Sequence, residues 1–230
     1  MLMALANSKG GVGKSTIAVH LAVWMAEQGH KFVFVDSDVQ GSSSAWLKEA
    51  SPNLATVRLV TPDDILDQLP KLSVNFEHVV IDGPAGLSEV TRSILYLSDI
   101  AIFPCGPSVL DLRAAIDAVE VTRKIQEIRG GLPHAIIIPN KLQPQYRLSR
   151  ELLDTVRNLG MPAGDGLCLR QAYADAAGQG TVVWRMNSPG ARAATAELQF
   201  FFQQLFAYES TSNPPNHGRR LAAQHSGDHA

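Results

Sequence analysis

Apolar residues in the first 140 positions fall into short continuous runs, separated by longer stretches with helical spacing. The runs are rich in Val, Ile and Phe and are bounded by Gly, Pro, Asp or Asn; they cover residues 2–6, 32–35, 78–81, 100–104 and 135–138. Near-continuous apolar strands are typical of a parallel sheet covered on both faces. The pattern therefore predicts five strands of one buried sheet.

The stretches between these runs predict helices over residues 15–28, 87–97, 112–128 and 147–159, three of them followed by glycine. Strands and helices that alternate in this way predict an α/β fold: a doubly wound, mainly parallel sheet with helices on both faces. Two further apolar runs, 166–169 and 181–184, predict outer strands of the same sheet.

A last long helix is predicted over residues 189–208. Its large apolar side chains share one face: Leu198, Phe201, Phe202, Leu205 and Phe206. Such a face can pack in a core or lie on a membrane, but membrane-surface helices usually carry Lys or Arg, and residues 197–209 contain neither. Core packing is therefore favoured. We expect one domain over residues 1–208 and a disordered tail, rich in Ser, Asn, Pro, His and Gly, over 209–230.

Composition and charge indicate the class of protein and its expected cellular location. The chain of 230 residues is 45% hydrophobic and carries a net charge of −2, which suits a globular protein but not one coated with nucleic acid. The charge is uneven, since residues 141–192 hold seven basic against four acidic residues. Two cysteines cannot form a disulfide framework, and no apolar segment reaches membrane-spanning length. We expect a cytoplasmic protein with a local basic face.

The clearest chemical signal is the segment Lys9, Gly10, Gly11, Val12, Gly13, Lys14, Ser15 and Thr16, between the first predicted strand and helix. Glycines let successive backbone N–H groups point inward at a phosphate chain, and the N-terminus of the following helix adds positive potential. Lys14 would reach the β- and γ-phosphates, and the Ser15 hydroxyl would bind Mg²⁺. The segment therefore predicts an ATP and Mg²⁺ site.

Residue 8 is Ser where the general phosphate-loop pattern has Gly, and Lys9 stands directly before the glycine pair. In these features the chain resembles the deviant Walker A ATPases of the ParA/MinD family. The resemblance implies an ATP-sandwich homodimer in which Lys9 touches the phosphates of the partner subunit.

Three further segments of the chain match motifs of that family. Asp36 and Asp38 follow the second strand as in D-x-D-P-Q, although Val39 replaces the proline. Carboxylates at the carboxyl edge of a parallel sheet lie beside the phosphate loop. By resemblance, Asp38 positions the attacking water and is catalytic together with Lys9 and Lys14, and Asp36 helps to organise the metal shell. Asp82 ends an apolar strand like a Walker B aspartate and would hold Mg²⁺, and Asn140 would read the adenine edge.

The resemblance covers residues 1–207 and is closest to small ParA proteins of the ParF type, with matching segments at 44–46, 107–111 and 170–176. It implies a weak ATPase whose ATP dimer binds double-stranded DNA without sequence preference and therefore lies on the nucleoid. A ParB-like or adaptor protein stimulates hydrolysis and releases the dimer, so that plasmid DNA, chromosomal DNA or a protein cargo is segregated. Arginines bind phosphates through counterion release. The DNA contacts are expected from Arg147, Arg150, Arg170 and Arg192.

Two alternatives remain. A MinD-like, membrane-associated switch shares the nucleotide site but needs a basic amphipathic terminus, so no membrane is expected here. A relative that carries an iron–sulfur cluster needs paired cysteines, whereas Cys105 and Cys168 lie on separate predicted strands.

Overall fold

The computed structural model describes residues 1–158 and 165–212, and in this part of the chain six parallel strands form one sheet in the order β3-β2-β4-β1-β5-β6. The strands are β1 (Leu2–Asn7), β2 (Phe32–Asp36), β3 (Thr56–Arg58), β4 (His78–Ala85), β5 (Ile100–Cys105) and β6 (His134–Pro139). The α-helices are α1 (Lys14–Glu27), α2 (Ser42–Ala50), α3 (Pro62–Asn75), α4 (Glu89–Leu97), α5 (Val109–Arg129), α6 (Arg147–Asn158), α7 (Gln171–Gly178) and α8 (Pro189–Ser212).

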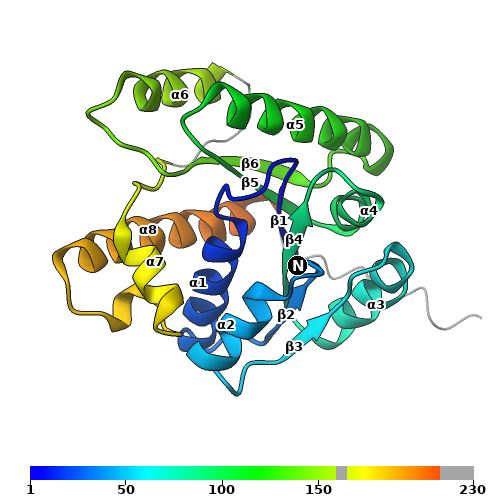
Figure 1. Ribbon diagram of the computed structural model, residues 1–230. Coiled ribbons are helices and arrows are strands. Elements are labelled where there is room, and N and C mark those ends of the chain that lie inside the picture. Colours follow the sequence, from blue (N-terminus) through cyan, green and yellow to red (C-terminus); the bar gives the residue numbers. More distant parts are fainter. Residues whose placement is uncertain (159–164, 213–230) are drawn as a thin grey trace, which may run out of the picture.

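Helices cover both faces of the sheet (Figure 1). Side chains alternate between the faces of a strand, and β1 shows the result: Met3 and Leu5 join the core beneath α1, α7 and α8, whereas Leu2 and Ala4 join the core beneath α3 and α4. A third group of buried residues, around Phe103, packs beneath α5 and α6. The predicted α/β fold, a doubly wound parallel sheet, is confirmed.

The five predicted strands are all present, but the two predicted outer strands are wrong. Residues 166–169 contribute only an isolated bridge between Leu142 and Cys168, and Val183–Arg185 is a short 3₁₀ helix. The apolar character of these runs has another cause, since Leu167, Val182 and Val183 are buried in the core beside α1 and α8. Burial of a loop side chain produces the same apolar signal as a strand.

The sequence pattern also missed four elements: β3, α2, α3 and α7. β3 is only three residues long and its side chains are exposed or half-buried, so it has no apolar run to reveal it. Its place at the sheet edge nevertheless matters, because Arg58 at its end supports a loop of the site described below.

The apolar face of α8 is buried, as predicted: Leu198, Phe202 and Leu205 are almost fully inaccessible. The helix continues to Ser212, four residues beyond the predicted end. The remainder of the predicted tail, 213–230, and the predicted end of the fourth helix at Leu159 lie outside the described residues. Within the described ranges, no helix combines the length and apolar character that crossing a membrane demands.

Candidate nucleotide site

The segment Lys9–Thr16, which we call the phosphate loop, leaves the carboxyl end of β1 at the centre of the sheet and enters α1. Gly11 and Gly13 have φ angles of +74° and +100°, in the left-handed region that favours glycine. The Lys14 ammonium is buried and lies 3.4 Å from the carbonyl oxygen of Lys9. Burial lowers the pKa of Lys14, while the carboxylates of Asp82 and Asp38 oppose this change. The loop thus offers glycine-shaped backbone and a buried cation to a phosphate chain.

Asp82 carries the strongest indication of a cation-binding site. It is only 1% exposed, and neither of its carboxylate oxygens has a hydrogen-bond partner among the described residues. The hydroxyls of Ser15 and Ser43 lie near enough to lower its pKa, although neither meets hydrogen-bond geometry. Buried polar atoms without partners are rare, and a carboxylate beside a serine hydroxyl is a donor set that Mg²⁺ prefers. The residues fit the predicted metal, which Ser15 and Asp82 would hold.

The ionisation of Asp82 ties this site to stability. Burial is the main cause that raises the pKa of Asp82 to about 6 from 3.8, and the nearby Asp36 adds to the shift. The folded state therefore binds a proton at Asp82 more tightly than the unfolded state does. The stability gained from this protonation is fully present below about pH 4 and is lost as the pH rises through 6. At pH 7 the ionised carboxylate therefore costs about 3 kcal/mol of folding free energy.

Asp36 stands next to Asp82 in the register of β2 and β4, as its predicted role in the metal shell requires. However, both of its carboxylate oxygens are engaged: Oδ1 accepts the N–H of Asp38 at 3.0 Å, and Oδ2 accepts the N–H of Ser44 at 2.9 Å. In this structure Asp36 thus fixes the loop that carries Asp38 and the first turn of α2. Its contact with a metal stays a prediction.

The Asp38 loop has a second support that the sequence did not reveal. Nη2 of Arg58 donates to the carbonyl oxygens of Asp38 and Val39 at 3.1 and 2.8 Å. Gly41 has a φ of +66°, in the left-handed region that favours glycine, and a Cβ there would come within 3.1 Å of the guanidinium and displace it. No local motif marks Arg58, because its contacts lie about twenty residues away along the chain. Arg58 therefore holds the backbone of the predicted catalytic residue.

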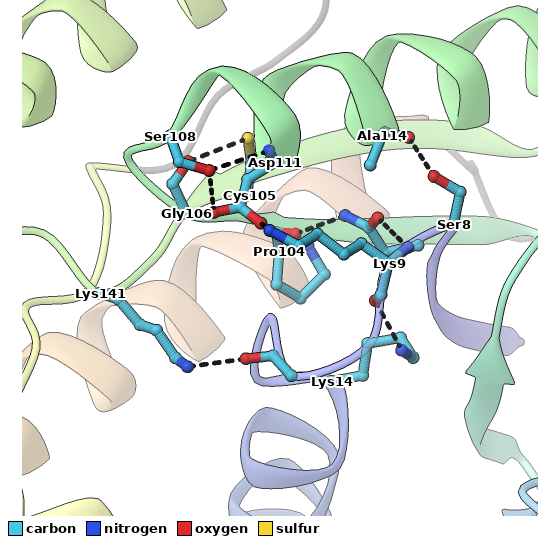
Figure 2. A network of polar contacts seen from close by, with 12 residues as sticks. Ser8, Lys9, Lys14, Pro104, Cys105, Gly106, Ser108, Asp111, Ala114 and Lys141 are labelled. Carbon is cyan, nitrogen blue, oxygen red and sulfur yellow. Dashed lines mark hydrogen bonds and ion pairs between the residues drawn. The ribbon is translucent and has the colours of Figure 1, made fainter.

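Lys9 is held within its own subunit, in the network that Figure 2 shows. Its ammonium forms an ion pair of 2.6 Å with Asp111 in the first turn of α5. The same carboxylate accepts the Ser108 hydroxyl at 2.7 Å, and the Ser108 hydroxyl accepts the N–H of Asp111 at 3.1 Å. The sequence signal for Asp111 is its spacing from Ser108, which is typical of a helix N-cap with an acidic residue three positions later.

Asn140 does not point freely toward a base. Its Nδ2 donates to the carbonyl oxygen of Val12 at 2.7 Å, and its Oδ1 accepts the N–H of Lys141 at 2.8 Å. A Cβ on Gly13 would lie 2.3 Å from Nδ2, so the approach is too close for any other residue. The contact of Asn140 with the adenine edge stays a prediction. In this structure Asn140 braces the phosphate loop.

A cavity of about 260 Å³ adjoins the loop. Its lining includes Gly13, Ile17, Asn140, Leu167 and Tyr173. The Tyr173 hydroxyl is buried without a hydrogen-bond partner among the described residues, and burial raises its pKa. A mostly apolar pocket with a few polar groups is typical of a site for an aromatic base.

The four arginines predicted to bind DNA do not form one cluster. Arg147 and Arg150 project from α6, on the α5 side of the sheet, whereas Arg170 and Arg192 belong to the α7 and α8 side (Figure 1). Arg150 is exposed and has no ion pair within the described ranges. Arg147 is exposed but paired with Glu151 at 2.8 Å, and Arg192 donates to Asn187 at 3.2 Å.

Arg170 is the least suited of the four. Its side chain is 27% exposed and forms a two-pronged ion pair with Glu197 of α8, at 2.5 and 3.3 Å. Glu197 also accepts the N–H of Cys168, so the pair joins α8 to two residues that line the cavity, Cys168 and Arg170. The role of Arg170 as a DNA contact stays a prediction, and in this structure its guanidinium is instead bound to Glu197 within the protein.

Comparison with known proteins agrees with this geometry. A family model described as the CobQ/CobB/MinD/ParA nucleotide binding domain matches residues 3–183. The chain is 28% identical over 197 residues to maintenance of carboxysome distribution protein A of Halothiobacillus neapolitanus, covering 84% of this chain and 90% of that protein. It is 24% identical to protein IncC of Escherichia coli, covering 89% of this chain and 68% of that one.

Among solved structures, an ATP complex of a McdA variant from Cyanothece superposes with a TM-score of 0.72. The superposition covers 86% of this chain and 95% of the other, at 15% sequence identity. At this identity the likeness supports the fold alone, and it agrees with the sheet and helix layers described above.

Proposed function

The chain belongs to the CobQ/CobB/MinD/ParA nucleotide-binding family, as an ATPase of the ParA/MinD type, and we propose that it is a weak, partner-stimulated ATPase that positions a cargo. The observation that carries this proposal is the buried carboxylate of Asp82 beside the phosphate loop, which has no hydrogen-bond partner in the described part of the chain. Such a carboxylate is costly without a cation, and Ser15 at the start of α1 completes the donor set for Mg²⁺.

Each group of the site has a part in hydrolysis. Lys14 lies buried where the β- and γ-phosphates of ATP would sit, and its charge offsets theirs. Mg²⁺, when bound, neutralises charge that develops on the phosphate oxygens. Asp38 is half-buried, its backbone is fixed by Arg58, and its carboxylate can orient the attacking water. Because there is little covalent chemistry for the protein to perform, turnover depends on this positioning.

Lys9 links ATP binding to dimerisation in this proposal. In the structure Lys9 is bound to Asp111 of its own subunit. In an ATP-sandwich homodimer, Lys9 would leave Asp111 and contact the phosphates of the nucleotide held by the partner subunit. ATP thereby sets the oligomeric state, and hydrolysis returns Lys9 to Asp111.

The ATP dimer binds double-stranded DNA without sequence preference and lies on the nucleoid until a ParB-like or adaptor protein stimulates hydrolysis. Arg147 and Arg150 on α6 are the proposed contacts, and dimerisation doubles them. The relatives are named for carboxysome distribution and for protein IncC, so the cargo is proposed to be a large protein assembly or a DNA molecule. A MinD-like membrane role is disfavoured, because the apolar face of α8 is buried in the core.

The decisive experiment is fluorescence anisotropy of a labelled random-sequence duplex with ATP and Mg²⁺, with ADP and Mg²⁺, and without nucleotide, at two salt concentrations. Binding confined to the ATP state and weakened steeply by salt is the expected result. Arg147→Ala should weaken it, whereas Lys71→Ala is a matched control, because Lys71 also forms an i,i+4 pair on the surface but lies on α3. Confirmed ATP binding without DNA binding in any state would refute the positioning role on DNA.

A further inference from the structure

Lys141 is the only residue other than glycine with a positive φ among the described residues, at +57°. It directly follows β6 and Asn140, and its side chain is exposed. A left-handed backbone is disfavoured for a residue with a long side chain, and it persists only where surrounding contacts determine it. Specific contacts must therefore hold Lys141 in this conformation.

The reason is visible at the end of the side chain. Nζ of Lys141 donates to the carbonyl oxygen of Gly11 in the phosphate loop at 2.7 Å, across 130 positions of sequence. Figure 2 shows the Lys141 side chain reaching the phosphate loop. Its neighbour Asn140 donates to the next carbonyl of the loop, that of Val12. Two adjacent residues at one strand end thus capture two successive carbonyls of the loop.

Because the peptide bond is planar, these two contacts also fix the direction of the neighbouring N–H groups in the loop. In a trans peptide unit the C=O of one residue and the N–H of the next point in opposite directions. With the Gly11 carbonyl held by Lys141, the N–H of Val12 faces away from that lysine. With the Val12 carbonyl held by Asn140, the N–H of Gly13 is fixed in the same way. Within the described ranges neither N–H donates a hydrogen bond to the protein.

We propose that Lys141 is a positioning residue of the nucleotide site, which together with Asn140 orients the N–H groups of Val12 and Gly13 toward the phosphates. The inference rests on the proposed ATP site and adds a residue to it that touches no phosphate itself. Lys141 is the first residue of the basic stretch 141–192, but its ammonium is committed to the loop rather than to DNA.

The test compares Lys141→Asn and Lys141→Arg with the natural protein, by titrating fluorescent ATP and ADP analogues with Mg²⁺ and by thermal unfolding. Asn adopts the left-handed conformation readily but is too short to reach Gly11. Lys141→Asn should therefore unfold at the natural temperature or above, yet bind both nucleotides on the order of tenfold more weakly, since a charge-assisted hydrogen bond is lost. Lys141→Arg, which keeps a donor of sufficient length, should recover most of the affinity.

The ratio of ATP to ADP affinity is the second readout. N–H groups of the loop serve phosphates that both nucleotides share, so the two affinities should fall by one factor. Undiminished affinity in Lys141→Asn would overturn the inference, as would a loss confined to ATP, which would indicate a direct contact with the γ-phosphate. A natural protein that binds neither analogue would refute the proposed function itself, and this inference with it.

Discussion

Replacing Asp111 with Asn is expected to destabilise the monomer and, at the same time, to strengthen ATP-dependent dimerisation. The substitution removes the charge that holds Lys9 within its own subunit and keeps a side chain of the same size at the start of α5. Lys9 is then available to the partner subunit without first breaking an ion pair. The two effects have opposite signs because the ion pair exists only in the monomeric state.

The magnitude follows from the exposure of the pair. The side chain of Lys9 is 40% exposed and that of Asp111 is 15% exposed, so solvent screens part of the interaction. A pair in this setting is worth about 1 kcal/mol. A symmetric dimer releases two such lysines, and about 2 kcal/mol corresponds to a roughly thirtyfold stronger dimer. The loss in the monomer should lower its melting temperature by about 2–4 °C.

Analytical ultracentrifugation with a non-hydrolysable ATP analogue and Mg²⁺ measures the dimer constant, and calorimetry without nucleotide measures the melting temperature. Asp67→Asn is the control, because Asp67 forms an equally short but more exposed ion pair with Lys71 on α3, away from the nucleotide site. It should leave the dimer constant unchanged. If Asp111→Asn lowered the melting temperature but left dimerisation unchanged or weaker, the ion pair would be structural only and the reasoning would be refuted.

Four further substitutions test other parts of the protein. Asp82→Asn should stabilise the nucleotide-free protein by about 3 kcal/mol at pH 7, because the pKa of the carboxyl is raised to about 6. This gain in stability should vanish below about pH 4, and Mg²⁺ should no longer stabilise the variant. Chemical denaturation at a series of pH values measures the gain, and a gain that persisted below about pH 4 would contradict the reasoning. Arg58→Met should lower kcat about tenfold at unchanged ATP affinity, since it loosens only the loop of Asp38; a steady-state assay that showed a change in KM alone would contradict this. Arg170→Ala should lower stability by about 1–2 kcal/mol through its half-buried ion pair, whereas the exposed Arg150→Ala should leave stability intact and weaken DNA binding.

Much of the fold was predictable because five of the six described strands are buried on both sides. β1 is buried along its whole length, and a strand of this kind shows as an apolar run whatever its neighbours are. The same reasoning failed at residues 181–184, where Val182 and Val183 are buried but the backbone turns into a 3₁₀ helix. Apolar character reports burial, and it does not distinguish a strand from a loop that fills the core.

Part of the candidate site could also be predicted from the sequence, and part depends on the tertiary structure. The sequence by itself determined the phosphate loop and Asp82, because glycine spacing and a carboxylate at a strand end have local causes. Only the tertiary structure decided that Lys9 is bound to Asp111, that Asn140 and Lys141 hold the loop, and that Arg170 is committed to α8. These contacts join residues between 27 and 130 positions apart. No local pattern encodes such a pairing, since the packing of helices against the sheet brings the partners together.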